Sequence, residues 1–278
     1  MFKNVLGFKI VLFLFIAFLA SFLILSEFIL GKESEPHQYK LTNSWVLPSI
    51  LEEISGMEYL QDNKVLCIQD EDGYLFLYNL ETSKIDKKIK FGGGGDYESI
   101  AVIKDTAYVL RSDGKLFEIK DFLNTVEVKT YDFNSDIRYN FEGLYYDYPK
   151  NRLLMAPKYK AKKDKDTKPI FSFDLTTKQF IKEPVFSIPL NHEILKNTME
   201  FMPSSIDKDP AKNEFYLLDG RHQKLLILDS LFTPLKLYHL DDVDLPQPES
   251  ITFSKNKTFI STEADRGVLQ HIYEIELD

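Results

Sequence analysis

Pro248-Glu249-Ser250-Ile251 is one of five similar segments that divide the chain at nearly even intervals. The other four are Ile54-Ser55-Gly56-Met57, Tyr97-Glu98-Ser99-Ile100, Phe141-Glu142-Gly143-Leu144 and Pro203-Ser204-Ser205-Ile206. Their small third residues are separated by 43, 44, 62 and 45 positions. A period of about 40–45 residues is typical of β-propeller blades and of some helical arrays. The segments therefore define five repeats, and the third repeat is enlarged.

Each repeat contains short apolar segments that are separated by turn residues, which favours β-strands. The 22 Phe and 15 Tyr residues point the same way, because aromatic side chains suit pleated surfaces. The Asp-Gly pairs at 72–73, 113–114 and 219–220 are predicted hairpin turns, since glycine accepts a positive φ. These turns also interrupt every candidate helix, which disfavours a helical array.

Four strands per repeat fit the period, so the sequence predicts an all-β fold, a five-bladed β-propeller with four-stranded blades. The chain ends soon after the third strand of the last repeat, and the segment 38–46 is expected to supply the fourth strand and close the ring. The extra length of the third repeat predicts a short helix around 191–201.

An unbroken apolar run covers residues 10–25, follows Lys3 and Lys9, and resumes at 28–30. This pattern predicts an N-terminal transmembrane helix or a long signal peptide, and no small-x-small cleavage site follows it, which favours an uncleaved anchor. The expected organisation is a membrane segment at 1–31, a linker at 32–38 and the propeller at 39–278. The basic N-terminal flank predicts a single-pass cell-membrane protein with its propeller on the extracytoplasmic side.

The formal net charge of −9 argues against a nucleic-acid partner, because Lys and Arg dominate phosphate binding. A cation or a small-molecule or protein ligand is a better expectation. Cys67 is the single cysteine, so no intramolecular disulfide can form, and its apolar neighbours predict a buried position.

Aligned repeats place three carboxylates in one structural column, which consists of Ser55, Glu98, Glu142, Ser204 and Glu249. A second column lies two residues earlier and consists of Glu53, Asp96, Asn140, Met202 and Gln247. The innermost strands of a propeller begin at its central channel, so these side chains are expected to converge. Confined carboxylates must take up protons or bind a cation.

Calcium accepts six to eight oxygen ligands, and neither column contains His or Cys, which argues against zinc or copper. The sequence therefore predicts an axial calcium site with Glu98, Glu142, Glu249, Glu53 and Asn140 as candidate ligands. The alternative is that each Glu caps a strand or bonds to a neighbouring blade.

The connection from Lys158 to Lys168 carries six lysines. It is predicted to be a solvated hairpin, and the alternatives are a docking surface for anionic groups or a flap over one face of the domain.

The five quoted segments, extended by Asn140 and Gln247 and placed behind an apolar N-terminus, resemble the SdiA-regulated family of bacterial envelope proteins. The resemblance covers the chain after residue 40 and implies a five-bladed propeller, distantly similar to NHL-repeat proteins, with a bound calcium ion and no settled activity. Where this chain has Ser99 and Ser250 after the Glu in place of glycine, its backbone is less free.

Two classes of function remain open. The first is a ligand-binding or interaction module that uses calcium as a structural pin. The second is a calcium-dependent hydrolase of the lactonase, esterase or phosphoesterase type, for which the candidate catalytic residues are Asp219, Glu263, Arg111 and Lys158. Residues of this kind are more often surface groups of hairpins, and no common catalytic motif is present, so the sequence favours binding and does not decide whether the protein is an enzyme.

Overall fold

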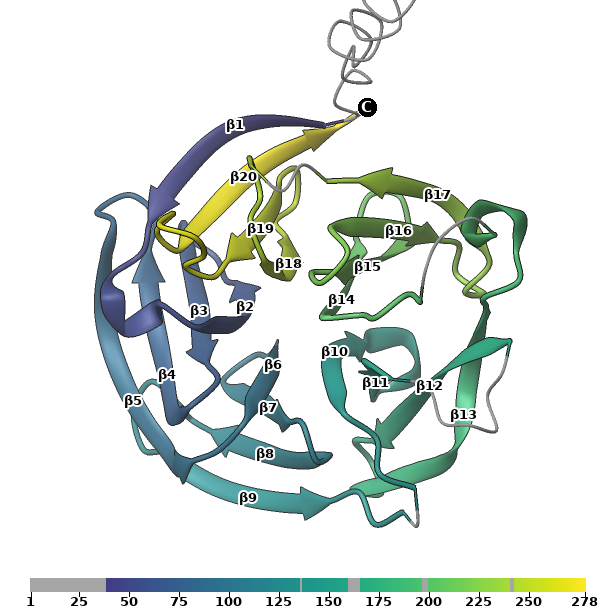
Figure 1. Ribbon diagram of the computed structural model, residues 1–278. Coiled ribbons are helices and arrows are strands. Elements are labelled where there is room, and N and C mark those ends of the chain that lie inside the picture. The colour runs from purple at the N-terminus through teal and green to yellow at the C-terminus, as the bar shows by residue number, and fades with distance from the viewer. Residues whose placement is uncertain (1–38, 136, 160–165, 197–199, 241–242) are drawn as a thin grey trace, which may run out of the picture. The chain divides into compact units, whose positions relative to one another are not determined.

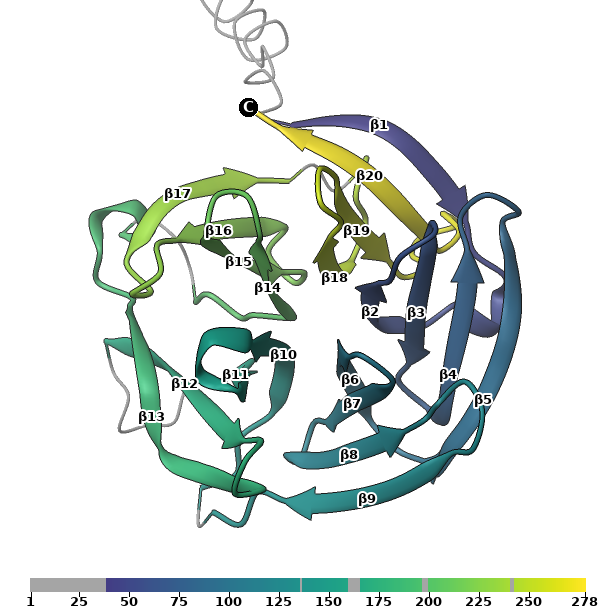
Figure 2. The same cartoon turned by 180° about the vertical axis from the view of Figure 1, so that it is seen from behind.

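The computed structural model describes residues 39–278 except 136, 160–165, 197–199 and 241–242. Within the described residues, twenty strands form five four-stranded antiparallel sheets, and Figures 1 and 2 show these sheets arranged as a ring. The prediction of a five-bladed propeller is confirmed. The ring belongs to a compact unit, Gln38–Asp278.

The strands of each blade run from the axis outwards in chain order, with one exception at the closure. Blade 1 contains β2 (Ile54–Tyr59), β3 (Lys64–Gln69), β4 (Asp72–Asn79) and β5 (Lys84–Gly94). Blade 2 contains β6 (Tyr97–Ile103), β7 (Thr106–Arg111), β8 (Lys115–Lys120) and β9 (Glu127–Asp132). Blade 3 contains β10 (Phe141–Asp147), β11 (Arg152–Pro157), β12 (Thr167–Asp174) and β13 (Gln179–Pro189). Blade 4 contains β14 (Ser205–Asp209), β15 (Glu214–Asp219), β16 (Lys224–Leu228) and β17 (Pro234–His239).

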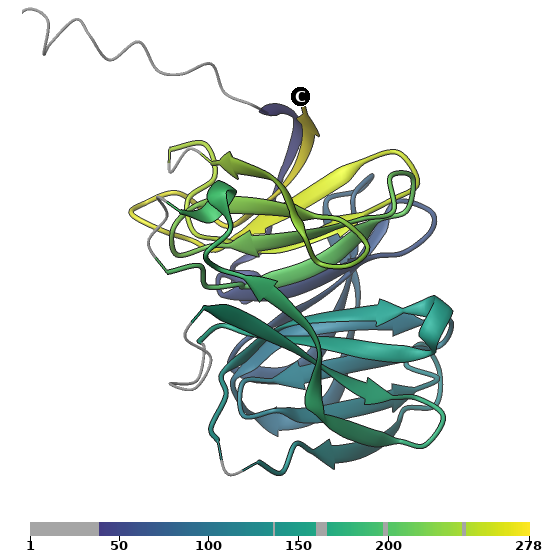
Figure 3. The same cartoon turned by 90° about the vertical axis from the view of Figure 1, so that its right-hand side faces the viewer.

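Blade 5 combines the two ends of the described chain, because it contains β18 (Pro248–Phe253), β19 (Thr258–Thr262), β20 (His271–Leu277) and β1 (Tyr39–Val46). Strand β1 pairs antiparallel with β20, with Tyr39 opposite Leu277, and the two strands lie side by side in Figures 1 and 3. Trp45 Nε1 also donates a hydrogen bond of 2.7 Å to Leu80 O of blade 1. The predicted closure by the N-terminal strand is confirmed.

The predicted membrane segment at 1–31 lies outside the described residues. Across the described part of the chain, no helix has both the length and the apolar character needed to cross a bilayer. The helices that are described are the short 3₁₀ turns η1 (Ser49–Leu51), η2 (Tyr148–Lys150) and η3 (Glu193–Leu195). The last of these is the short helix expected around 191–201.

The hydrophobic core is divided into five clusters, and each cluster lies between two neighbouring blades. Aromatic rings fill much of this space. Between blades 2 and 3, Phe133 packs edge-on against Phe141 and Phe171, with ring centroids 5.0 and 5.3 Å apart. Burying these flat faces between sheets explains the high Phe and Tyr content.

The small third residue of each repeated segment faces the innermost strand of the next blade. In three blades this residue is a serine whose Oγ accepts a backbone hydrogen bond from that strand: Ser99 from Leu144, Ser205 from Ile251 and Ser250 from Met57, at 3.1–3.2 Å. In the other two blades it is glycine, and a Cβ on Gly143 would lie 2.7 Å from Ile206 Cγ2. Close approach of the innermost strands therefore sets the residue size at this position.

One of the predicted turns is wrong. Asp72 and Gly73 lie inside β4, and the turn that precedes β4 is formed by Asp70 and Glu71. A Cβ on Gly73 would lie 2.6 Å from the backbone of Gly92 in β5, so this glycine permits close approach of two strands. Gly114 does have the expected positive φ, at 86°.

Candidate functional site

A β-bulge interrupts the pairing at the start of the innermost strand in four of the five blades. In each case one residue has no partner in the neighbouring strand, and the unpaired residues are Ser55, Glu98, Glu142 and Glu249. In blade 4, two consecutive residues share one partner in the neighbouring strand. Ser204 N–H donates to Leu218 O, and Ser205 is the register partner of Leu218. A bulge turns the extra side chain away from its normal direction in the pleat. The four bulged residues all belong to the first predicted column.

The three carboxylates of this column lie close enough to perturb one another. Burial raises the pKa of Glu98 to about 10, and the charges of Glu142, Asp96 and Glu249 add to the rise. Burial also raises the pKa of Glu249 well above its ordinary value, with contributions from Glu263 and Glu142. The charges of Glu98, Glu142 and Glu249 therefore act on one another.

A lysine ammonium lies among these carboxylates. Lys158 Nζ is 3.2 Å from Glu142 Oε1, and Asn140 Nδ2 donates to the same oxygen at 2.8 Å. Burial lowers the pKa of Lys158, but Glu142, Glu249 and Glu98 outweigh this effect and raise it overall. Among the described side chains, no group of three or more Asp, Glu, His or Cys is close enough together to hold a metal ion as it stands.

Two further acids extend the cluster toward blades 1 and 5. Burial and the neighbouring Glu53 raise the pKa of Asp70 to about 6. Burial, Asp70 and Glu53 raise the pKa of Glu263 to about 7, and Gln247 Nε2 donates to Glu263 Oε2. The predicted ligand Glu53 thus lies beside Asp70 and Glu263. The sequence interpretation missed Asp70 because it follows a strand directly and looks like an ordinary turn residue.

Five buried side-chain oxygens have no hydrogen-bond partner in the described structure, and two of them bear on the predicted ligands. These two are Ser55 Oγ, from the blade 1 position of the bulged column, and Asp70 Oδ1. Buried polar atoms are nearly always satisfied, so an orphaned oxygen needs a reason, such as a missing ion or water. Hard oxygen donors are the ligands that calcium prefers. The chemistry of these oxygen donors therefore suits a calcium ion, although the described acids would have to move closer together to bind one.

Two of the candidate catalytic residues already have strong partners. Asp219 is fully buried and accepts backbone hydrogen bonds from Met202 at 2.9 Å and His222 at 3.0 Å. Arg111 forms a two-point ion pair with Asp113, at 2.9 and 2.6 Å. Both residues hold loops in place, whereas Glu263 and Lys158 lie at the axial cluster.

The Lys158–Lys168 connection is only partly described, since residues 160–165 lie outside the described part. Lys168 differs from the prediction of a solvated position, because it is completely buried and its Nζ donates to Lys158 O at 2.6 Å.

Two pockets open near the axial carboxylates. The first, of about 450 Å³, is lined by residues that include Lys158, Glu249, Arg221 and Arg266. The second, of about 340 Å³, is lined by residues that include Asp96, Asn140 and Arg138. Tyr159 contributes to both pockets.

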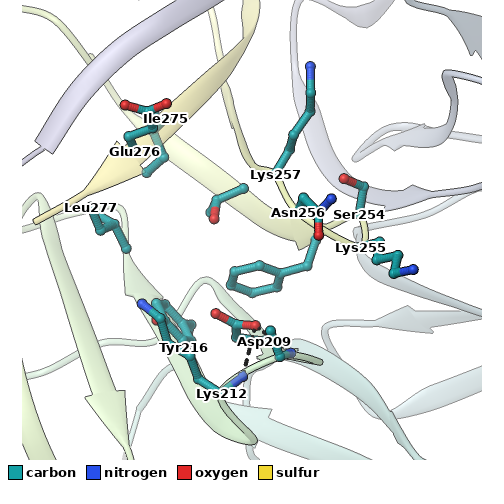
Figure 4. A pocket seen from close by; sticks show the side chains of 13 residues that line it. Asp209, Lys212, Tyr216, Ser254, Lys255, Asn256, Lys257, Ile275, Glu276 and Leu277 are labelled. Carbon is teal, nitrogen blue, oxygen red and sulfur yellow. Dashed lines mark hydrogen bonds between the residues drawn. The ribbon is translucent and has the colours of Figure 1, made fainter.

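A third pocket, of about 330 Å³, lies at the opposite ends of the strands and is drawn in Figure 4. It lies between the β14–β15 turn at Lys212, the β18–β19 turn at 254–257 and the end of β20. None of the axial acids lines it.

A ring of five four-stranded sheets with carboxylates at the starts of its innermost strands defines the class: a five-bladed β-propeller with an acidic axial site. The chain belongs to the SdiA-regulated family, whose family model matches residues 32–266. The resemblance inferred from the repeated segments is confirmed. No curated protein sequence matches the chain.

Solved structures with the same architecture are distant in sequence. Glutaminyl cyclase from Myxococcus xanthus aligns with a TM-score of 0.60 and 12% identity, over 86% of this chain and 96% of that one. A protein of unknown function from Bacteroides thetaiotaomicron aligns with a TM-score of 0.51 and 12% identity, over 81% of this chain and 70% of that one. A luciferin-regenerating enzyme aligns with a TM-score of 0.51 and 10% identity, over 85% of this chain and 94% of that one. At these identities the likeness concerns the fold alone.

Proposed function

We propose that this protein is a membrane-anchored, extracytoplasmic binding module whose propeller holds a calcium ion at its axis. The observation that carries the proposal is the repeated bulge at Glu98, Glu142 and Glu249 in three blades, together with the mutual influence of their charges. Carboxylates brought together in this way are costly unless a cation compensates them. Lys158 supplies one positive charge to this cluster, which also contains Asp70 and Glu263.

The ligand set would combine the three column carboxylates with the orphaned oxygens Ser55 Oγ and Asp70 Oδ1. Glu53 lies beside Asp70, and Asn140 Nδ2 donates to Glu142 Oε1, so both predicted ligands would act on neighbouring carboxylates even where they do not bind directly. A calcium ion there would fix innermost strands from several blades to one point. The ion would thereby stabilise the face of the propeller that also carries the two pockets near the axial carboxylates.

Calcium binding should stabilise the propeller strongly. At a hundred times its dissociation constant a ligand stabilises a fold by about 2.7 kcal/mol, which for a domain of this size raises Tm by about 5–10 °C. The measurement is thermal unfolding of Gln38–Asp278 before and after calcium is added to protein treated with a chelating resin. Combining Glu98→Gln, Glu142→Gln and Glu249→Gln should abolish the shift. The proposal fails if the wild type shows no shift, and the site lies elsewhere if the triple variant responds normally.

A hydrolase remains the second candidate because Glu263 has a pKa raised to about 7, which suits a group that accepts a proton near neutral pH. The bound cation would polarise a carbonyl or phosphoryl oxygen. A screen of calcium-loaded protein against lactones, aryl esters and phosphoesters separates the two classes. Turnover that Glu263→Gln removes would establish the enzyme, and its absence across the screen supports the binding module.

The membrane anchor rests on the apolar run at 10–25. We expect the full chain to remain in the membrane fraction after an alkaline carbonate wash and Gln38–Asp278 to be released. Protease added to the outside of spheroplasts should digest the propeller. Protection from that protease would contradict the extracytoplasmic placement, and release of the full chain would contradict the anchor.

A further inference from the structure

In four consecutive blades a basic side chain lies at the end of the second strand or within four residues after it. Each follows or ends the second strand of its blade: Arg111 ends β7, Lys158 follows β11, Arg221 follows β15 and Arg266 follows β19 by four residues. Blade 1 has Asp70 at this place. These four basic residues are called the outer basic ring below. The face therefore carries basic side chains close to the acidic column.

Three members of the outer basic ring line one pocket. Lys158, Arg221 and Arg266 meet there with the amides of Gln223 and Gln247 and the carboxylate of Glu249. The volume of about 450 Å³ falls in the range of small-molecule sites. Arg266 Nε is 2.7 Å from Asp265 Oδ2, so part of its charge is already matched. Arg221 is exposed and forms no ion pair among the described residues, so its guanidinium is available to a ligand.

Lys158 belongs to both the pocket and the acidic column, and its backbone is held on both sides. Its N–H donates to Asn140 O at 2.7 Å, and its carbonyl accepts from the buried Lys168 Nζ at 2.6 Å. The side chain is 26% exposed, whereas the Glu142 carboxylate that it contacts is 3% exposed. A fixed backbone with a flexible four-carbon side chain allows the ammonium to change partners by rotation about its own bonds.

We propose that this pocket binds a small organic anion, a carboxylate or a phosphate monoester, and that Lys158 couples the binding of this anion to the axial cation. The coupling rests on the proposed calcium site. A divalent cation among Glu98, Glu142 and Glu249 repels the ammonium that now lies there, so Lys158 turns into the pocket and adds its charge to Arg221 and Arg266. An anion in the pocket draws Lys158 away from Glu142 in the same manner, and reciprocity then requires that it strengthens calcium binding.

The test uses three probes of similar size: phenyl phosphate, phenylacetate and the uncharged phenylacetamide. Calorimetric titration of Gln38–Asp278 should show binding of at least one anion and none of the amide. Calcium should tighten anion binding by about fivefold or more, the lower end of ordinary coupling between sites. The comparison of the two anions decides which acid group the pocket prefers.

Three variants separate the parts of the proposal. Arg221→Met should weaken anion binding about tenfold or more and leave the calcium-induced Tm shift unchanged, because a charge-assisted hydrogen bond is lost only in the pocket. Lys158→Met should raise calcium affinity and make anion affinity independent of calcium. Arg111→Met is the matched control from the same ring, because Arg111 is held by Asp113 and does not line this pocket, and it should change neither quantity.

The outcomes distinguish this inference from the proposed function. If calcium stabilises the wild type but Lys158→Met leaves calcium affinity unchanged and calcium leaves anion affinity unchanged, the coupling is wrong and the calcium site stands. If no anion binds, or if Arg221→Met binds anions as well as the wild type, the anion pocket is wrong. If calcium has no effect on the wild type, both the proposed function and the coupling fail.

Discussion

Raising the pH from 5 to 8 without calcium should lower the free energy of unfolding of the propeller. Buried acids in the axial region have a raised pKa in the folded protein: about 6 for Asp70, about 7 for Glu263 and Asp207, and about 10 for Glu98. The folded state therefore binds more protons than the unfolded chain above the ordinary carboxyl pKa. Stability is fully present below that ordinary pKa and is lost as the pH rises toward each folded-state pKa.

Each proton bound only by the folded state contributes about 1.4 kcal/mol per pH unit. Protonation of one acid weakens the repulsion on its neighbours, so the contributions of the individual acids do not add in full. We expect the free energy of unfolding to fall by about 3–5 kcal/mol in total, most steeply between pH 5 and 6. The measurement is urea unfolding of resin-treated protein at intervals across this range. A flat profile would contradict the raised pKa values and, with them, the close packing of the axial acids.

Calcium should remove only part of this dependence of the free energy of unfolding on pH. It would keep Glu98 and Glu249 ionised, but a second pair of acids lies two residues beyond the repeated small residue in two of the innermost strands: Glu58 in β2 and Asp207 in β14. Burial raises the pKa of Glu58, and the Asp207 charge adds to it. Asp207→Asn should remove only the part of the remaining slope that comes from Asp207, because the amide carries no charge at any pH, while burial keeps the pKa of Glu58 raised.

The repeat spacing was sufficient to predict the blade number and the closure of the ring, because both depend on chain length and strand period alone. The column of Glu98, Glu142 and Glu249 could be aligned from the sequence, but the bulge that directs it could not be seen. A bulge adds one residue to one strand relative to its partner, and hairpin lengths vary enough to hide it.

Side-chain contacts within blade 3 were harder to predict. The sequence interpretation considered Lys158 as a weak catalytic candidate within a solvated loop, whereas its ammonium meets Glu142 of the neighbouring inner strand. Lys168 belongs to the same lysine-rich stretch and is completely buried. Composition gives both residues the same description, and only the fold, which brings the start of β12 to the end of β11, distinguishes them.

Gly73 illustrates the same limit at the level of backbone. An Asp-Gly pair between two apolar runs is a strong turn signal, yet here the glycine serves a strand contact with Gly92. The partner lies in the glycine run 92–95, which the sequence shows but cannot pair with residue 73.

Glu98→Gln should make the calcium-free propeller more stable and its response to calcium weaker. Glu98 has a pKa of about 10 in the folded protein because of burial, Glu142 and Asp96, so at pH 7 folding requires it to take up a proton. That uptake costs about 3 kcal/mol relative to a carboxyl with an ordinary pKa near 4.5. The amide has the same shape, no charge and no such cost, but it is a poorer ligand for calcium.

The matched control is Glu127→Gln at the exposed start of β9, which should change stability by no more than about 0.5 kcal/mol. The gain from Glu98→Gln should also shrink to less than about 1 kcal/mol at pH 5, where the folded-state proton is acquired almost without cost. If Glu98→Gln destabilises the calcium-free protein at pH 7, then the Glu98 charge is a net stabilising partner of Lys158, and the axial acids are a structural ion-pair network. If it stabilises the protein and weakens the calcium response, then Glu98 is kept at a cost to stability because the site needs its charge, as is common where function and stability conflict.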